Sequence, residues 1–480
     1  MALKVYNTLN KKKEKFIPLN RGKVDMYVCG PTVYDTSHIG HARCVVVFDM
    51  IYRWLMALGF QVRYVRNFTD VDDKIIKKSN ETGEACRVIT EKYIDEFHKE
   101  MDLLNVLRPD VEPKATEHIS NIIKFIKMLI EKKAAYHVDG GGVYFSLDTF
   151  KDYGRLSRRD IEGMRAGARI AVDNQKKNPM DFVLWKPAKE GEPFWESPWG
   201  RGRPGWHIEC SSMSYEYFGK SFDIHGGGKD LIFPHHENEI AQSEALFGQQ
   251  FVKYWIHNGF VDINNEKMSK SLGNFIMIKE VLENYSPEVI RMFLLSKHYR
   301  NPIDYSEDSM KEVGMGLDRI YAFLERLEKA GVKDKPGEDE QRGELWDNFT
   351  RAMNDDFNSA KAIGLIFEAV KRGNKLLDEV DDNLNQMRHD NFRSVYSDIK
   401  AISTIFGIFM LDPQAWFKAK KDKGLEDKSL DPEMIEDLIL QRLHARKNRD
   451  FTKADEIRNH LQDKNIILED GPEGTTWRVG

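Results

Sequence analysis

Two histidines near position 40 are the first residues whose types and spacing could support chemistry. His38 and His41 lie one helical turn apart in the stretch His-Ile-Gly-His, with Gly40 between them. Residues 24–28 are mostly apolar and predict a strand, and the helix-capping types at 35–37 (Asp, Thr, Ser) predict a helix start. Because backbone N–H groups gather at a helix start, the site suits a phosphate or a nucleotide. The plainer interpretation, ordinary α/β packing, stays open for so short a motif.

A second group of residues has the composition of a metal site. Four residues of ligand-forming types are far apart in the chain: Cys29, Cys210, His235 and Glu239. Two thiolates, one imidazole and one carboxylate form a donor set that suits Zn²⁺. Scattered ligands predict a site inside a fold, whereas zinc knuckles take their ligands in close pairs. The plainer interpretation is two core cysteines and a helical histidine, and His236 and Glu237 are competing candidates in the same run.

Two lysines in a polar loop could complete a phosphate site. Lys267 and Lys270 belong to the stretch Lys-Met-Ser-Lys-Ser at 267–271. A lysine ammonium is a point charge, which suits the charge that develops on phosphoryl oxygens. Such a loop alone is typical of a solvated surface. Together with the His-Ile-Gly-His stretch, it predicts that a triphosphate is bound from two sides.

Composition limits the class of protein. The 480 residues suffice for about two to four domains, and 41% hydrophobic with 31% charged residues describe a soluble globular protein. The net charge of −5 gives no overall basic field, so a nucleic-acid partner must bind local patches. No apolar run reaches membrane-spanning length, and the lysine-rich N-terminus lacks the apolar core of a signal peptide. Four cysteines argue against a disulfide framework and predict a reducing, cytoplasmic compartment.

The elements that must position these residues alternate between strand and helix. Residues 45–58 are apolar nearly all round and predict a buried helix that ends at Gly59, followed by a strand over 60–65. Strand, helix and strand predict a βαβ unit with a parallel sheet, which binds ligands beyond the carboxyl ends of its strands. The polar loop 67–74 follows, and helix capping is the plainer interpretation of its aspartates at 72 and 73.

The middle of the chain interrupts and then resumes this alternation. Apolar residues at helical spacing predict a helix over 119–130, while a short strand at 143–147 and the basic stretch 155–177 predict an insertion. Residues 237–247 predict a helix with proline near its start, which places His235 and Glu239 on one face. Residues 254–261 predict another strand.

The chain beyond Tyr321 is predicted to be helical and highly charged. Bundle helices are predicted over 362–377 and 392–410, a linker over 333–342 and a loose charged segment over 418–431. Helix starts are predicted at 431–432 and, as a capping box, at 452–455, before a strand-rich end at 466–479.

These motifs together resemble a known family. The stretches 38–41 and 267–271 are similar to the two signatures of class I aminoacyl-tRNA synthetases. Further segments narrow the resemblance to the cysteinyl-tRNA synthetase family: 28–35, 67–74, 205–211, 225–239 and, in the tail, 445–446, 450–451, 454–455, 468–470 and 474–478. The stretches 333–342 and 418–431 lie outside any matching motif. Cys44 and Cys86 match no functional position and are interpreted as structural.

The resemblance implies an α/β fold with a Rossmann-type, doubly wound parallel catalytic domain. An inserted connective segment, a helical anticodon-binding domain and a small mixed C-terminal domain accompany it. The implied boundaries are 1–118 and 195–258 for the two catalytic halves, 119–194 for the insertion, 259–320 for a stem-contact region with the lysine loop, 321–417 for the anticodon-binding domain and 418–480 for the C-terminal tRNA-binding domain.

The resemblance also implies a two-step reaction. ATP and L-cysteine form cysteinyl-adenylate and pyrophosphate, with Mg²⁺ on the phosphates, and the cysteinyl group then moves to the 3′ end of tRNA(Cys). By the resemblance, His38 and His41 hold the ATP phosphates and Gly40 lets the nucleotide lie close. Lys270, with Lys267, stabilises the transition state.

One zinc ion completes the implied site. By the resemblance, Cys29, Cys210, His235 and Glu239 bind it, it binds the substrate thiolate, and Thr69, Trp206 and His225 line the amino-acid pocket. Packing separates cysteine from serine by only about 1–3 kcal/mol, whereas a soft metal favours thiolate and lowers the thiol pKa. The insertion is short for a separate proofreading domain. We expect a cytoplasmic monomer with tRNA(Cys), ATP and L-cysteine as partners and no membrane partner.

Three alternatives stay open. A ligase of the same lineage that joins cysteine to an amino sugar would share both sites but lack the tRNA-reading tail. Another His-x-Gly-His nucleotidyltransferase would be shorter and would not need Cys210 or Glu239. A non-catalytic zinc-bearing RNA-binding protein would show no cysteine-dependent pyrophosphate exchange. A solvated helical bundle is likewise the plainer interpretation of the region beyond Tyr321.

Overall fold

The computed structural model describes residues 2–159, 176–268, 273–332, 342–379, 386–426, 432–464, 466–471 and 474–479. They form two compact units, one from Met1–Met315 and Lys335–Ile408, the other from Gly316–Asp334 and Phe409–Gly480. These units are not the predicted domains, whose boundaries stay a prediction. Among the described helices, none combines the length and apolar character that a membrane span requires.

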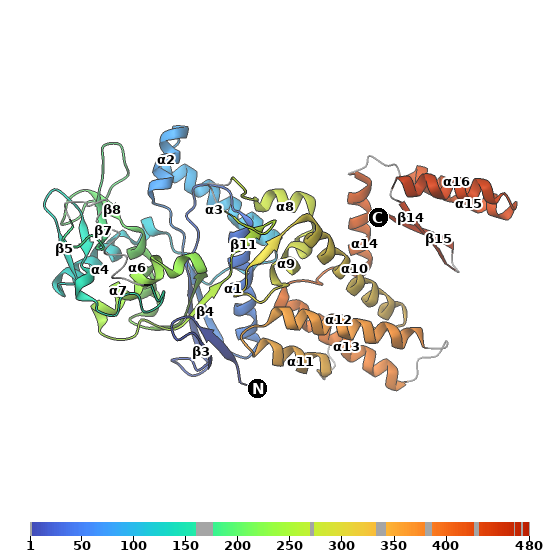
Figure 1. Cartoon of the computed structure of the whole chain (residues 1–480), viewed down its shortest axis with the longest axis horizontal. Coiled ribbons are helices and arrows are strands. Elements are labelled where there is room, and N and C mark those ends of the chain that lie inside the picture. The colour runs from blue at the N-terminus through green and yellow to red at the C-terminus, as the bar shows by residue number, and fades with distance from the viewer. Residues whose placement is uncertain are drawn as a thin grey trace. The chain divides into compact units, whose positions relative to one another are not determined.

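A four-stranded parallel sheet in the order β10-β9-β3-β4 lies in the first unit. Its strands are β3 Lys23–Val28, β4 Gln61–Arg66, β9 Phe222–Gly228 and β10 Val252–Asn258. Helix α1 (Ile39–Ala57) joins β3 to β4 and is buried along most of its length, as its apolar sequence predicts (Figure 1). A Cβ at Gly226 would lie 2.3 Å from the Phe48 ring, so the missing side chain lets α1 lie directly on β9. The predicted βαβ unit and parallel sheet are confirmed.

An antiparallel sheet in the order β5-β6-β7-β8 has three strands within the predicted insertion, 119–194, and its fourth strand just beyond the predicted end. Its strands are β5 Ala135–His137, β6 Val143–Phe145, β7 Phe182–Pro187 and β8 Gly202–Pro204. Helix α4 (Ile119–Glu131) buries the apolar face predicted for it, with Ile122, Phe125 and Leu129 in one core with Trp185. That core also receives side chains from α6 (Trp206–Phe218) and α7 (His235–Phe247). Most of the basic stretch 155–177 lies outside the described residues.

Smaller elements surround the parallel sheet in the first unit. They are β1 Lys4–Asn7, β2 Lys12–Lys15, α2 Asp73–Thr82, α3 Cys86–Leu103, η1 Ala115–His118, η2 Leu147–Thr149, η4 Lys229–Ile232, β11 Val261–Ile263, β12 Glu266–Lys267, α8 Ile278–Asn284, α9 Pro287–Leu295 and β13 Ile303–Tyr305. The bundle helices predicted over 362–377 and 392–410 are present as α12 Ser359–Asp378 and α13 Gln386–Phe406, and α11 Glu344–Met353 is a further helix that was not predicted. Both α9 and α13 pack against α1.

The second unit is built from helices and one hairpin. Its elements are the end of α10 (Glu307–Lys329), α14 Pro413–Glu426, α15 Pro432–Lys447, α16 Phe451–Asp463, β14 Ile466–Gly471 and β15 Gly474–Val479. Tyr321 of α10 stacks on Trp416 of α14 with ring centroids 4.6 Å apart. Ile435, Ile439 and Leu461 of α15 and α16 share a core with Trp477 of the hairpin.

Two predictions of helix starts are wrong in detail. His38 caps α1, rather than Asp35, Thr36 or Ser37, because its ring and that of His41 form a reciprocal capping box. Asp450 caps α16, rather than a residue within 452–455, because its carboxylate accepts from the Lys453 backbone N–H at 3.1 Å. By contrast, Asp72 caps α2 as the plainer interpretation predicted.

Two other segments also differ from prediction. The charged segment 418–431 is helical as far as Glu426, where the described part ends, because α14 is anchored by Trp416. The strand predicted over 254–261 is interrupted after Asn258, and β11 starts at Val261. Gly259 lies at this break, where its backbone N–H bonds to the Tyr299 carbonyl at 2.8 Å instead of a sheet neighbour.

Candidate functional site

A pocket of about 500 Å³ lies at the carboxyl ends of the parallel strands, where a sheet of this kind binds its ligands. Its walls come from 28–36 after β3, from the first turns of α1, from 228–231 after β9 and from 258–261 after β10. Gly30 lets the ends of β3 and β4 approach, because a Cβ there would lie 1.6 Å from the Asn67 carbonyl oxygen.

The two predicted histidines line this pocket. Their rings stack with centroids 3.7 Å apart, and each Nδ1 accepts from the other residue's backbone N–H at 3.3 Å. Burial, followed by the charges of His38 and Lys74, lowers the pKa of His41 well below its ordinary value. A neutral ring whose Nδ1 is an acceptor carries its proton on Nε2. The capping pair therefore presents N–H donors that suit an anion at the start of α1.

The lysine loop approaches the same helix start. Met268 of this loop lies against Gly40. A Cβ added at Gly40 would lie 3.0 Å from the Met268 Cε and 3.0 Å from the His38 ring. The loop's far end is fixed to α1, since the Ile39 N–H donates to the Ile276 carbonyl at 3.0 Å. Residues 269–272, with Lys270, and the Lys267 side chain lie outside the described part of the structure. Their action on phosphates stays a prediction.

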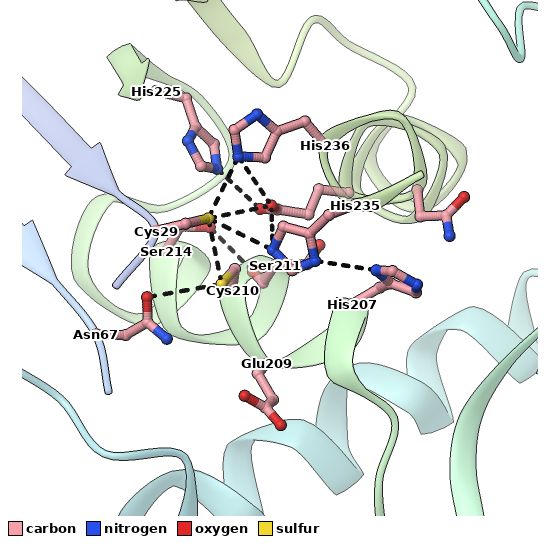
Figure 2. Close-up of polar contacts among 12 residues, drawn as sticks. Cys29, Asn67, His207, Glu209, Cys210, Ser211, Ser214, His225, His235 and His236 are labelled. Carbon is pink, nitrogen blue, oxygen red and sulfur yellow. Dashed lines mark hydrogen bonds and ion pairs between the residues drawn. The ribbon is translucent and has the colours of Figure 1, made fainter. Parts of the chain in front are cut away.

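The four predicted metal ligands lie together on one side of the pocket. Cys29 directly follows β3, Cys210 lies on α6, and His235 and Glu239 lie one turn apart on α7, as Figure 2 shows for the labelled residues. The Cys29 Sγ lies 3.6 Å from the Cys210 Sγ, 3.4 Å from the His235 Nε2 and 3.6 Å from the Glu239 Oε1. The His235 Nε2 lies 3.1 Å from the same Glu239 oxygen. All four residues are buried.

These separations fit one tetrahedral ion. Bonds of about 2.3 Å to sulfur and about 2.0–2.2 Å to nitrogen or oxygen give tetrahedral edges of about 3.3–3.8 Å. Three of the four measured edges fall in this range and the fourth is slightly shorter. The residues therefore fit a zinc ion without rearrangement of the backbone.

A second set of buried residues overlaps the first. Cys29 and Glu239 also lie near His225 and His236, so that two groups of four share two members. The His236 Nε2 is 3.4 Å from the Cys29 Sγ but 3.9 Å from the Glu239 Oε1. His225 instead contacts the other carboxylate oxygen at 2.9 Å, which is a hydrogen-bond distance. The first group fits an ion better, and His225 holds the Glu239 carboxylate in place.

Neighbouring histidines orient the inward-facing rings. The His235 Nδ1 lies 3.0 Å from the His207 Nδ1, and the His236 Nδ1 lies 2.8 Å from the His257 Nε2. Each contact leaves Nε2 directed at the Cys29 sulfur. Outer contacts of this kind orient the ring of a metal ligand.

The four groups shift one another's pKa values. Burial opposes charge on His235, but the charges of Glu239 and Cys210 outweigh it and raise its pKa to about 10. Burial is likewise outweighed at Glu239, where His225 and His235 lower the pKa to about 2. At Cys210 the hydrogen bond from Cys29 and the charge of His235 outweigh burial and lower the pKa to about 6, whereas burial raises that of Cys29 well above its usual value. Without an ion, Glu239 and Cys210 are therefore ionised at neutral pH, whereas His235 and Cys29 carry protons that metal binding would release.

The residues predicted for the amino-acid pocket are only partly brought together. Trp206, 38% exposed, lines the pocket and stacks on the His235 ring with centroids 4.4 Å apart. Thr69 is buried and donates its hydroxyl hydrogen bond to Glu209 at 2.8 Å. His225 is also fully buried, stacked on Trp255. Neither Thr69 nor His225 is among the residues that line the pocket.

Sequence reasoning assigned no role to several residues of this pocket. Lys74 and Asp230 line it, and the Lys74 ammonium lies 5.5 Å from the centre of the Tyr34 ring. Both residues belong to stretches whose pattern had been noted, 67–74 and 225–239. Only the tertiary structure, which brings the start of α2 and the short helix η4 to the pocket, shows that these side chains reach it.

Comparisons with known proteins were made for the whole chain. Residues 15–315 match the family model "tRNA synthetases class I (C) catalytic domain", and residues 348–410 match "DALR domain". The chain is 52% identical over 488 residues to the cysteine–tRNA ligase of Trichlorobacter lovleyi and 52% identical over 481 residues to that of Syntrophotalea carbinolica. It is 52% identical over 486 residues to that of Geobacter sulfurreducens. In each case all of both chains is covered.

Solved structures with similar folds belong to other synthetases. Methionyl-tRNA synthetase of Mycobacterium tuberculosis in complex with methionyl-adenylate matches with a TM-score of 0.60 and 16% identity, over 86% of this chain and 94% of that chain. A putative arginyl-tRNA synthetase of Campylobacter jejuni matches with a TM-score of 0.54 and 14% identity, over 81% and 94%. At these identities the likeness shows the fold alone, and it agrees with the predicted α/β class.

Proposed function

The chain belongs to the cysteine–tRNA ligases among the class I tRNA synthetases, and on that premise we propose that it activates L-cysteine with ATP and transfers it to tRNA(Cys). The observation that carries this proposal is the shared pocket. Cys29, one of the four potential metal ligands, and Trp206, which stacks on the ligand His235, line the same pocket as His38 and His41 of the capping pair. A soft-metal site and an anion site within one pocket suit a substrate thiol and a nucleotide that react together.

The first step joins cysteine to AMP. The cysteine carboxylate attacks the α-phosphorus of ATP and pyrophosphate leaves, with Mg²⁺ on the phosphates. His38 and His41 donate Nε2–H hydrogen bonds to phosphate oxygens, and Lys270 with Lys267 stabilises the charge that develops there. In the second step a hydroxyl of the terminal adenosine of tRNA attacks the cysteinyl carbonyl, and AMP leaves.

Selection of cysteine is assigned to the metal cluster. Cys29, Cys210, His235 and Glu239 would hold one zinc ion, which supplies a soft Lewis acid that favours a thiolate over a hydroxyl. Trp206 supplies an aromatic surface beside the cluster. Thr69 and His225 act from behind the pocket wall, Thr69 through Glu209 and His225 through the Glu239 carboxylate.

Two observations separate this proposal from its alternatives. A ligase of cysteine and an amino sugar would lack the tail, whereas this chain matches cysteine–tRNA ligases over the whole length of both chains. A non-catalytic RNA-binding protein has no need of the capping histidines in the pocket. We also propose a cytoplasmic location, in accord with the four free cysteines, and separately a monomeric state.

The test combines metal analysis with pyrophosphate exchange. We expect about one zinc ion per chain, ATP–pyrophosphate exchange with cysteine and little with serine, and charging of total tRNA with labelled cysteine. Equal exchange with serine would contradict selection by zinc. Cysteine-dependent exchange without tRNA charging would favour the amino-sugar alternative, and no exchange at all would favour the RNA-binding protein. Size-exclusion chromatography tests the monomer.

A further inference from the structure

The segment 298–301, which follows α9, supports one wall of the pocket from outside. The Gly259 N–H donates to the Tyr299 carbonyl at 2.8 Å, and a Cβ at Gly259 would lie 2.3 Å from the Asn301 carbonyl oxygen. Gly259 and its neighbours 258–261 line the pocket. The position of this wall is therefore set by the backbone of 298–301.

The same segment contacts two other parts of the pocket. The Lys229 ammonium, next to the pocket residue Asp230, donates to the Arg300 carbonyl at 2.7 Å. The guanidinium of Arg43, on α1, lies 3.3 Å from the His298 carbonyl and 3.4 Å from that of Tyr299. Arg43 is fully buried and follows His41 by two residues. Three elements that contribute residues to the pocket thus contact one short segment.

A single carboxylate holds this segment on its other side. The Asp356 Oδ1 accepts from the Tyr299 hydroxyl at 2.8 Å and from the Tyr6 backbone N–H at 2.7 Å. Its Oδ2 accepts from the Arg300 Nε at 2.8 Å. Asp356 is fully buried, and a buried carboxylate with several donors is a rigid anchor because each lost bond leaves a buried polar group unsatisfied.

The backbone around this carboxylate is strained. Asp356 and Phe357 have φ values of +67° and +52°, so two consecutive non-glycine residues occupy the left-handed region. Such residues persist only where the surroundings determine their conformation. Here the Asp356 N–H donates to the Lys4 carbonyl at 2.9 Å, and the Phe357 side chain is fully buried. The turn lies between α11 and α12, so it joins the helical region to the pocket wall.

We propose that Asp356 is a positioning residue for the nucleotide: by fixing 298–301 it sets the pocket wall 258–261 and the neighbouring Lys229–Asp230. This inference rests on the proposed function, because it concerns the ATP site of the same enzyme. The wall 258–261 does not include Cys29, a potential metal ligand, or Trp206, which stacks on the ligand His235. The inference therefore predicts a selective effect on ATP rather than on cysteine.

The experiment compares variants at two neighbouring aspartates. Asp356→Asn removes the charge. Asp356→Gly removes the whole side chain and relieves the backbone, because glycine adopts positive φ readily. Asp355→Asn is the matched control, since Asp355 is 50% exposed and pairs at the surface with Lys13 at 2.7 Å. In cysteine-dependent pyrophosphate exchange, both Asp356 variants should raise the KM for ATP about tenfold, with less than about a twofold change in the KM for cysteine, while Asp355→Asn changes neither.

Titration of ATP binding by calorimetry gives a second, independent readout. An unchanged ATP affinity in Asp356→Asn and Asp356→Gly would overturn the inference, as would equal changes in both KM values, which indicate a merely structural role. If neither variant folds, Tyr299→Phe removes one bond to the same carboxylate and should still raise the KM for ATP by about threefold. An unchanged value there would also overturn it. Wild-type protein without exchange activity would contradict the proposed function alone, since the ATP titration still decides the inference.

Discussion

Cys29 and Glu239 belong to both overlapping groups of potential ligands, so neither residue tells where an ion binds. The discriminating residues are Cys210 and His236. Cys210 lies 3.6 Å from Cys29 and takes part in the group whose separations match a tetrahedron. His236 faces the same sulfur at 3.4 Å, but its group includes His225, whose ring is hydrogen-bonded to the other Glu239 oxygen at 2.9 Å. One substitution in each group therefore assigns the site.

At the residue scale, Cys210→Ser should remove the bound zinc. A serine hydroxyl is not ionised at neutral pH and is a poor ligand for zinc. We expect zinc content to fall from about one per chain to near zero and cysteine-dependent exchange to fall more than about 100-fold, with the far-ultraviolet circular dichroism unchanged. His236→Gln should keep its zinc. Zinc retained by Cys210→Ser and lost by His236→Gln would assign the ion to the other group.

Helix α3 places a carboxyl group behind the capping pair. Glu100 is buried beside Ser37, the residue before His38. Burial raises the pKa of Glu100 to about 7, and a hydrogen bond with Ser37 opposes part of this rise. The backbone N–H of Ile278, at the start of α8, donates to the Ser37 carbonyl at 2.9 Å. Three helices thus meet where the nucleotide is proposed to bind.

At the scale of single helices, Glu100→Gln in α3 should stabilise the protein in a pH-dependent way. An acid whose pKa is raised by folding disfavours the folded state once it ionises, so the wild type loses stability as pH rises from about 4.5 to 7. The variant lacks this loss. We expect a gain of at most about 1 kcal/mol at pH 5 and up to about 3 kcal/mol at pH 8, measured by urea denaturation.

The matched control for this helix is Asp95→Asn, which removes a charge from the exposed face of α3. It should not reproduce the gain at pH 8. A Glu100→Gln variant that is equally stable relative to wild type at pH 5 and pH 8 would show that Glu100 ionises normally in the folded protein.

Within the larger unit, one buried ion cluster joins three helices. Asp49 of α1 accepts from Arg53 at 2.9 Å and from Arg291 of α9. Arg53 also donates to the Thr404 carbonyl of α13 at 2.9 Å, and Arg291 donates to the Phe406 carbonyl. The helix that carries the capping pair is thereby fixed to the helical region, independently of the contacts of Asp356.

At the scale of the whole molecule, Asp49→Asn should lower the free energy of unfolding of the first unit by about 3–5 kcal/mol, because it leaves two buried guanidinium groups without their counter-charge. Thermal denaturation followed by circular dichroism would measure the change. Arg87→Gln breaks a surface pair with Glu91, in which Arg87 is 87% exposed, and should leave the melting temperature nearly unchanged. Similar effects of the two substitutions would mean that the buried cluster has no special role in stability.

Elements with strong local signals were predictable. The apolar run of α1, the periodic residues of α4 and the capping aspartate of α2 are encoded within short windows. The prediction of a loose segment over 418–431 was wrong as far as Glu426, because Trp416 of the same helix stacks on Tyr321, which lies far earlier in the chain. A short stretch of sequence around Trp416 gives no sign of so distant a partner.

The sequence by itself determined which reactive groups this protein has: the thiols of Cys29 and Cys210, a histidine and a glutamate one helical turn apart, and a histidine pair at a helix start. Residue type alone gives the thiols, and spacing within one helical turn gives the two pairs. Only the tertiary structure decided that Cys210 and His235 lie close enough to hold one ion, that His225 and Thr69 lie behind the pocket, and that Asp356 contacts the segment behind a pocket wall. Spacing along a helix fixes the face on which each side chain lies, because successive side chains point about 100° apart. The residues that pack against that face come from distant parts of the chain, so only the folded structure identifies them.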